Sequence, residues 1–147
     1  MITLQLNPDH IAKLTKELQR AGHREIGGVL VAEHIGADLF RLVDFSVQRS
    51  GGTAACFVRR PEHHKRFVAA FFRRTKDDFE RFNYLGEWHS HPSFSADPSG
   101  VDVAQMQAIV EGGPEAPLFA VLLVLRLRAT GGLELSAQAF RGGQIST

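Results

Sequence analysis

The spacing of hydrophobic residues along the chain changes repeatedly between the period of a strand and that of a helix. Residues 2–6 (ITLQL) and 133–139 (LELSAQA) alternate hydrophobic with polar side chains, as half-buried strands do. Residues 26–32 (IGGVLVA) and 119–125 (FAVLLVL) are continuous apolar runs with the length of strands buried on both faces. These four segments predict a sheet with buried central strands.

Two further segments predict strands of the same sheet. Val43, Phe45 and Val47 alternate with polar residues, and this run ends at the Ser-Gly-Gly turn of residues 50–52. Residues 84–91 (YLGEWHSH) are also expected to be extended. Trp88 alternates there with the flanking histidines, so its side chain is expected on the opposite face of the strand, in the core.

Three segments have the spacing of amphipathic helices. The first runs from the N-cap Asn7, followed by proline, to Gly22; the second runs from Pro61 to about Glu80; the third lies within residues 97–113. Their expected hydrophobic faces are Ile11, Leu14 and Leu18, then Phe67, Phe71 and Phe72, then Val103, Met106 and Val110. The strands and helices together predict an α/β or α+β fold, in which a mixed central sheet packs with about three helices.

Size and composition favour one domain over residues 1–147. The chain is 44% hydrophobic and large enough to bury a proper core. It has no apolar run long enough to span a bilayer and no signal-peptide pattern, so we expect a cytoplasmic protein that does not enter a membrane. The single cysteine, Cys56, has no partner for an internal disulfide and is interpreted as a small buried hydrophobe. A net charge of +1 does not favour binding to nucleic acid.

The segment GEWHSHPSFSADPSGVD, residues 86–102, carries the candidate chemistry. On an extended strand, His89 and His91 project from the same face, so both imidazoles can reach one point in front of the sheet. Pro98 suits the first turn of the helix that follows, and a short loop could therefore return the Asp102 carboxylate to the two histidines. Two imidazoles and one carboxylate suit zinc, and three protein ligands leave the fourth tetrahedral position for water.

Each half of this pattern also has a purely structural interpretation. A histidine on a strand is usually an ordinary core or surface residue. Ser99-x-x-Asp102 before an apolar helix matches an N-cap, with serine capping and an acid in the first turn. The order His, His, Pro, Ser, Asp is more specific than either half.

With these residues the sequence resembles the JAB/MPN domains that carry a JAMM motif, metalloproteases that cleave ubiquitin-like proteins from their targets. The motif consists of a glutamate on an early strand and a later His-x-His, seven residues, Ser, two residues and Asp. Here the second part is His89-Ser90-His91, residues 92–98, Ser99 and Asp102, and Glu25 lies ahead of the first apolar strand. The form GEWHSHP is most similar to the compact prokaryotic JAB proteins. The resemblance implies a single JAB/MPN-like, cytidine-deaminase-like domain.

The resemblance also implies roles for these residues. His89, His91 and Asp102 would bind one zinc ion per chain, and Glu25 would act as general base and then as general acid. The Ser99 hydroxyl would stabilise the oxyanion that develops on the attacked carbonyl. The substrate would be the amide bond after the C-terminal Gly-Gly of a ubiquitin-like or sulfur-carrier protein, whose extended tail suits a narrow groove.

Alternatives remain open at the level of sequence. Glu87 lies two residues before His89, so it shares that face of the strand and is a rival to Glu25 or a carboxylate that orients an imidazole. The chain could also be a non-catalytic JAB-fold interaction module, or a relative of the JAB proteins associated with DNA repair. The oligomeric state is left open.

The other histidines and basic residues are interpreted as structural or solvated. His10, His23 and His34 have no spacing that suggests a shared site. The second helix has a basic face that we expect to be solvated, with acidic-partner docking as the alternative. That face comprises Arg59, Arg60, His63, His64, Lys65, Arg66, Arg73 and Arg74.

Overall fold

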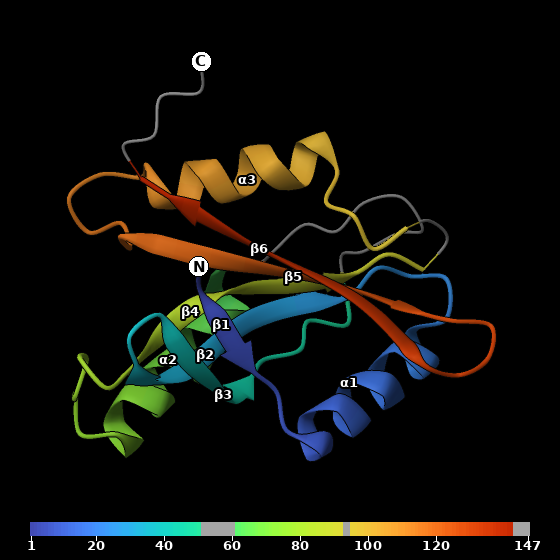
Figure 1. Cartoon of the computed structure of the whole chain (residues 1–147), viewed down its shortest axis with the longest axis horizontal. Coiled ribbons are helices and arrows are strands. Elements are labelled where there is room, and N and C mark those ends of the chain that lie inside the picture. The colour runs from blue at the N-terminus through green and yellow to red at the C-terminus, as the bar shows by residue number, and fades with distance from the viewer. Residues whose placement is uncertain (51–60, 93–94, 143–147) are drawn as a thin grey trace.

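The computed structural model describes residues 1–50, 61–92 and 95–142, and over these ranges six strands form one mixed sheet with three helices (Figure 1). In chain order the elements are β1 (Thr3–Gln5), α1 (Pro8–Ala21), β2 (Gly27–Gly36), β3 (Leu39–Phe45), α2 (Pro61–Arg74), β4 (Phe82–Ser90), α3 (Gly100–Val110), β5 (Phe119–Leu127) and β6 (Leu133–Arg141). The strand order is β1-β3-β2-β4-β5-β6. The pairs β1–β3 and β4–β5 are parallel and the others are antiparallel. The expected mixed sheet with about three helices is confirmed.

The sheet separates two hydrophobic clusters. Leu14 and Leu18 of α1 pack into the larger cluster, and Met106 and Val110 of α3 pack into the smaller one. Figure 1 shows α1 and α3 on opposite sides of β5 and β6. Trp88 of β4 is fully buried in the larger cluster, as its alternation with the histidines predicts.

The sheet is strongly curled around the larger cluster. Phe40 of β3 and Phe119 of β5 have ring centroids 5.4 Å apart, although β2 and β4 separate their strands in the sheet order. Such a contact requires the sheet to bend until its inner faces meet, beyond the ordinary twist of a sheet. The outer strands therefore close over the core, and α1 packs into it through Leu14 and Leu18.

The first helix has both of the termini that its sequence predicts. The Asn7 side chain accepts a hydrogen bond from the His10 N–H at 2.7 Å, which satisfies one unpaired donor of the first turn. Gly22 ends the helix with φ of 59°, a conformation that favours glycine, and its N–H donates to the Leu18 carbonyl. Leu14 and Leu18 are buried as expected, and Ile11 is half-buried.

The second helix is shorter than its sequence predicts, and the expectation that it continues to about Glu80 is wrong. It ends at Arg74, because Lys76 and Asp77 both adopt left-handed conformations with φ of 57° and 56°. The Asp77 N–H instead donates to the Phe72 carbonyl and closes the last turn. The strand predicted around Val47 is also shorter, since β3 ends at Phe45.

The expectation that His64 belongs to a solvated basic face is wrong. Its side chain is 2% exposed, and its Nδ1 lies 2.6 Å from the Ser46 hydroxyl while its Nε2 lies 3.1 Å from Gln48 Oε1. Because Gln48 Oε1 can only accept, the imidazole carries its proton on Nε2 and accepts the Ser46 hydroxyl proton at Nδ1. The predictions for Cys56, Arg59, Arg60, the turn glycines 51 and 52 and the His63 side chain lie outside the described residues.

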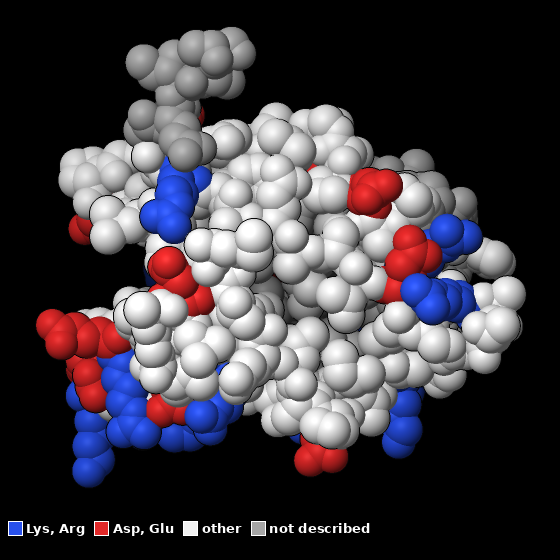
Figure 2. Space-filling view, viewed as in Figure 1, with Lys and Arg blue, Asp and Glu red and all other residues white. Residues whose placement is uncertain are grey.

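Charged side chains are unevenly distributed on the face shown in Figure 2. Lysine, arginine and acidic residues gather together around the α2 end of the molecule, whereas the middle of this face carries few charges. Among the ion pairs of the described residues, Glu33 lies 2.7 Å from Arg81 and 3.9 Å from Arg41. In the described part of the chain, none of the helices has the length and apolar character needed to cross a membrane.

Candidate metal centre

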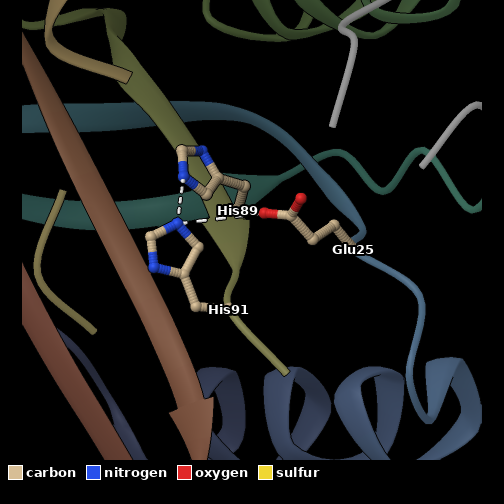
Figure 3. Close-up of side chains that lie close together, drawn as sticks. All are labelled: Glu25, His89 and His91. Carbon is tan, nitrogen blue, oxygen red and sulfur yellow. Dashed lines mark hydrogen bonds and ion pairs between the residues drawn. The ribbon is translucent and has the colours of Figure 1, made fainter. Parts of the chain in front are cut away.

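The two histidines of the motif are fixed by the centre of the sheet. β4 pairs with β2 on one side and with β5 on the other, and His89 is in register with Gly27 and Val124. The His91 N–H extends the parallel ladder by donating to the Leu125 carbonyl at 2.8 Å. Both side chains are buried, and their Nε2 atoms lie 3.2 Å apart (Figure 3).

Asp102, in the first turn of α3, completes a triangle of donor atoms. Its Oδ2 lies 3.2 Å from His89 Nε2 and 3.1 Å from His91 Nε2. Nitrogen and oxygen ligands placed 2.0–2.1 Å from a tetrahedral zinc ion would be about 3.3 Å apart. The spacing and chemistry of these three donors therefore fit one face of a tetrahedral metal site.

A capping box holds the Asp102 carboxylate in place. Ser99 is the N-cap of α3, and its Oγ accepts a hydrogen bond from the Asp102 N–H at 3.1 Å. In return, the Ser99 N–H donates to Asp102 Oδ2 at 2.8 Å. The capping interpretation of Ser99-x-x-Asp102 is confirmed, and the same carboxylate oxygen also faces both imidazoles. The helix cap therefore orients the candidate ligand.

Glu25 lies beside this triangle, immediately before β2. It is 3% exposed, and its Oε1 lies 3.8 Å from His91 Nε2 (Figure 3). Its second oxygen, Oε2, is buried without a hydrogen-bond partner among the described residues. Unpaired buried carboxylate oxygens are costly, so an acceptor left free at this position fits a site that receives a further group, such as a metal ion or water.

Ser90 secures the position of Glu25. The Ser90 hydroxyl accepts from the Ile26 N–H at 3.0 Å, and the Ser90 N–H donates to the Ile26 carbonyl at 2.9 Å. These two bonds join the residue between the histidines to the residue after Glu25. The candidate base and the two histidines are thus held at adjacent points, where β2 begins and β4 ends.

The loop after β4 fixes the tautomer of His91. Its Nδ1 donates to the Ser95 carbonyl at 2.8 Å, so the lone pair of the neutral ring is on Nε2, toward the other donors. The next carbonyl of this loop, that of Ala96, accepts from the Ser136 hydroxyl of β6. A backbone carbonyl leaves no sequence signal, and the orienting role of this loop could not be seen in the motif.

The electrostatics of the cluster separate its two carboxylates. Burial raises the pKa of Glu25, and the nearby histidines offset only part of this effect. Burial acts in the same direction on Asp102, but bonds with His89, His91 and the Ser99 N–H hold its pKa well below its usual range. Burial lowers the pKa of His91, yet its contacts with Asp102 and the Ser95 carbonyl raise it overall. The arrangement combines a firmly ionised carboxylate with one that takes up a proton more readily.

The structure places the donor atoms of four of the five predicted site residues close together: Glu25, His89, His91 and Asp102. Among the described residues, the buried group able to hold a metal includes Glu25 with the two histidines, and Glu87 is not part of it. Glu87 lies on β4 between its partners Val29 and Leu122. Ser99 is adjacent through the capping box, and its role toward a substrate stays a prediction.

Comparisons with known proteins show what the chain is similar to. A curated relative, the CD-NTase/cGAS isopeptidase of Enterobacter hormaechei subsp. hoffmannii (strain UCI 50), is 26% identical over 145 residues, covering 93% of this chain and 74% of the relative. A protein of Desulfitobacterium hafniense solved in solution aligns with a TM-score of 0.64 and 17% identity, over 95% of this chain and 84% of that one, and shares the fold. A JAB1/MPN domain protein from Archaeoglobus fulgidus aligns with a TM-score of 0.49 and 12% identity, over 95% and 88% of the two chains.

The family model that describes prokaryotic homologues of the JAB domain matches residues 7–137, from the cap of α1 into β6. This match includes all the residues of the candidate metal centre. The chain belongs to the family of prokaryotic JAB-domain proteins.

Proposed function

We propose that the chain is a zinc-dependent isopeptidase that hydrolyses the amide bond after the C-terminal Gly-Gly of a ubiquitin-like or sulfur-carrier protein. The observation that carries the proposal is the triangle of His89 Nε2, His91 Nε2 and Asp102 Oδ2, with sides of 3.1–3.2 Å and with Glu25 beside it. The relative named as an isopeptidase supports the reaction class.

Three side chains would hold one zinc ion per chain: His89, His91 and Asp102. Zinc bound there supplies Lewis acidity to a carbonyl and lowers the pKa of water from about 15.7 towards 7. His91 would offer the lone pair of Nε2 to the metal, because its Nδ1 proton is directed to the Ser95 carbonyl. Asp102 remains ionised because the capping box and both imidazoles stabilise its charge.

Glu25 would move the proton of the reaction. As water attacks the carbonyl carbon, a new C–O bond forms and Glu25 accepts the water proton; as the C–N bond breaks, Glu25 delivers that proton to the leaving nitrogen. Burial raises the pKa of Glu25, which suits a group that must both accept and release a proton. The Ser99 Oγ accepts from the Asp102 N–H, so its own hydroxyl proton is available for the developing oxyanion.

The test combines metal content with hydrolysis of a fluorogenic peptide whose C-terminal Gly-Gly is joined to a dye by an amide bond. We expect about one zinc per chain in the wild-type protein and in Glu25→Gln. Glu25→Gln keeps a side chain of the same shape but cannot act as a base, so we expect turnover to fall by about 100-fold or more. His89→Ala should lose both zinc and turnover.

Two outcomes would contradict the proposal. Retained turnover in Glu25→Gln would remove Glu25 from the reaction and reopen Glu87 as the base. A wild-type protein that binds no zinc would instead favour a non-catalytic interaction module. The name of the Enterobacter relative makes a CD-NTase conjugate a suitable protein substrate for the next step.

A further inference from the structure

A pocket lined by arginine side chains lies beside the chain segment that carries Glu25. It has a volume of about 280 Å³ and lies between the end of α1 and the segments next to β2 and β3. Its lining consists of Glu17, Arg20, Ala21, Arg24, Ile26 and Arg49. Arg24 and Ile26 flank Glu25 in the chain, and Ile26 is bound to Ser90 between the two histidines. The pocket is therefore built in part by the two residues that flank Glu25, which places it near the candidate metal centre.

The positive charge of the arginine pocket exceeds its negative charge. Arg49 binds Glu17 through two hydrogen bonds, from Nε at 2.9 Å and from Nη2 at 2.6 Å. Arg20 reaches the same carboxylate only at 4.0 Å. Arg24 is exposed and has no ion pair in the described parts of the chain. One carboxylate thus faces three guanidinium groups, and the donors of Arg20 and Arg24 are largely free.

The arginine pocket is preformed and continues along α1. The Glu17 side chain is 12% exposed, and its two hydrogen bonds with Arg49 fix that guanidinium group against the helix. A second hollow shares Glu17 and Arg20 and adds Lys13, Lys16 and Asp44 to the lining. Five cations and two carboxylates therefore line the connected surface, which starts next to Glu25 and follows the exposed side of α1.

We propose that the arginine pocket docks an acidic segment of the protein substrate and thereby selects conjugates that carry carboxylate side chains near the scissile bond. The proposal rests on the proposed function for the identity of the partner as a protein. Planar carboxylates match the fork of a guanidinium group and can bind Arg20 and Arg24 without displacing the Glu17–Arg49 pair. A polyphosphate chain fits less well, because its charges repeat at every unit and would meet Glu17 and Asp44, whereas a peptide can place neutral residues against these two carboxylates.

Binding can be tested without catalysis, by fluorescence anisotropy of a labelled short peptide rich in glutamate. Its counterpart with glutamine at every acidic position reports contacts that do not depend on charge. We expect the acidic peptide to bind the wild-type protein more tightly than the glutamine peptide, and added salt to weaken this preference. The double variant Arg20→Gln/Arg24→Gln, which leaves the Glu17–Arg49 pair intact, should weaken binding of the acidic peptide at least about fivefold.

The matched control is Arg66→Gln/Arg73→Gln, because both arginines are exposed on α2 and their replacement removes the same number of charges from another surface. It should bind the acidic peptide as the wild type does. Equal binding of the acidic peptide to the wild type and the double variant would overturn the proposal. A single-stranded oligonucleotide that binds more tightly than the acidic peptide, and loses binding in the double variant, would also overturn it.

A second measurement separates this proposal from the proposed function. Two Gly-Gly amide substrates, one extended by glutamates and one by glutamines, are hydrolysed in parallel. We expect the double variant to raise KM for the glutamate substrate only and to leave kcat unchanged. If neither substrate is cleaved but the acidic peptide still requires Arg20 and Arg24, the proposed function fails and the docking surface stands. Equal KM changes for both substrates would contradict the docking surface alone.

Discussion

The Oδ2 atom of Asp102 lies close to three nitrogen atoms at once. It accepts from the Ser99 N–H at 2.8 Å and lies 3.1 Å and 3.2 Å from the Nε2 atoms of His91 and His89. The N-cap motif and the metal-ligand motif are therefore one arrangement in this chain, not competing interpretations of the same residues. Helix capping supplies the orientation, and the ionised carboxylate supplies the charge that a metal cation requires.

Substitutions at Ser99 can separate its capping role from its role in catalysis. Ser99→Ala removes the cap and the hydroxyl, so we expect a loss of about 1 kcal/mol in the free energy of unfolding and a fall in turnover of about 100-fold. Ser99→Asn restores a capping oxygen but has no hydroxyl, and should recover stability while turnover stays low. Urea unfolding and peptide hydrolysis measure the two effects. Full turnover in Ser99→Asn would limit Ser99 to capping.

At the scale of elements, the close pairing of β4 and β5 depends on a residue without a side chain. A Cβ atom added to Gly86 would overlap the backbone of Val121 on β5. Gly86 also lies at the irregularity where the register of β2 and β4 shifts. Since β4 carries His89 and leads directly into His91, its distance from β5 affects the candidate metal centre as well as the core.

Gly86→Ala should therefore destabilise the protein by about 3 kcal/mol, because the overlapping atom is backbone and cannot move aside as a flexible side chain would. Gly132→Ala is the control, since an added Cβ there meets nothing within 4 Å. Its effect should stay within about 0.5 kcal/mol. Urea unfolding compares the two variants with the wild type. Equal stability of Gly86→Ala and Gly132→Ala would show that β4 and β5 can move apart locally at no cost in free energy.

The position of α1 is fixed in part by an ion pair with a pH-dependent contribution. The hydrogen bond from Arg49 lowers the pKa of Glu17 and outweighs the opposing effect of burial. A carboxyl whose pKa is lowered in the folded protein stabilises it above its unfolded pKa of about 4.3, and this contribution is lost as the pH falls through the folded value. Arg49 is 62% exposed, so solvent limits the contribution to about 1 kcal/mol at most.

Glu17→Gln should remove this pH dependence. We expect the wild type to lose more stability than the variant when the pH is lowered from about 6 to about 3, by about 1 kcal/mol or less. Urea unfolding at the two pH values provides the measurement. Glu80→Gln, at an exposed glutamate without an ion pair among the described residues, should keep the wild-type profile. Parallel profiles for Glu17→Gln and the wild type would show that the pair contributes nothing.

At the scale of the whole molecule, local sequence signals predict the helices, the strands and the motif. Contacts between residues far apart in the chain determine which side chains are buried and which partners they bind. The ends of α1 could be predicted because Asn7 and Gly22 act on neighbouring residues of their own helix. The motif could be predicted because strand alternation places His89 and His91 together, and Asp102 follows within the same segment. The end of α2 was harder to predict, because Lys76 has no preference for the left-handed conformation, and Asp77 tolerates it without marking a helix end as clearly as glycine does.

His64 shows the same limit within the core. Its neighbours Lys65 and Arg66 are exposed, and the partners that bury its imidazole, Ser46 and Gln48, lie 18 and 16 residues away in the chain. The spacing of hydrophobic residues along α2 carries no information about those partners. The acceptor of the His91 Nδ1 proton is a backbone carbonyl, which every residue possesses, so the sequence could not identify Ser95 in that role.

The three candidate ligands differ in how the fold holds them. His89 and His91 belong to the paired centre of the sheet, whereas Asp102 is carried by α3, whose position depends on Met106 and Val110 against β5 and β6. Val124, the register partner of His89, belongs to the same hydrophobic cluster as Met106. The side chains that position α3 therefore set the distance between the third donor and the other two.

Met106→Ala should accordingly weaken zinc binding by about tenfold, although Met106 belongs to the α3 cluster and not to the ligand set, since small displacements of a ligand are costly. Leu14→Ala in the other cluster is the control, with a similar expected loss of about 3 kcal/mol in stability and unchanged zinc affinity. Competition with a zinc-sensitive dye measures the affinity. Equal zinc binding by both variants would show that α3 adjusts freely.

We therefore expect metal affinity to depend on residues beyond the three candidate ligands. The sheet holds the two histidine donors in fixed positions. The packing of α3 determines how close the Asp102 carboxylate lies to them. Variants with altered metal affinity or altered metal preference should therefore be sought among buried residues that are not candidate ligands themselves.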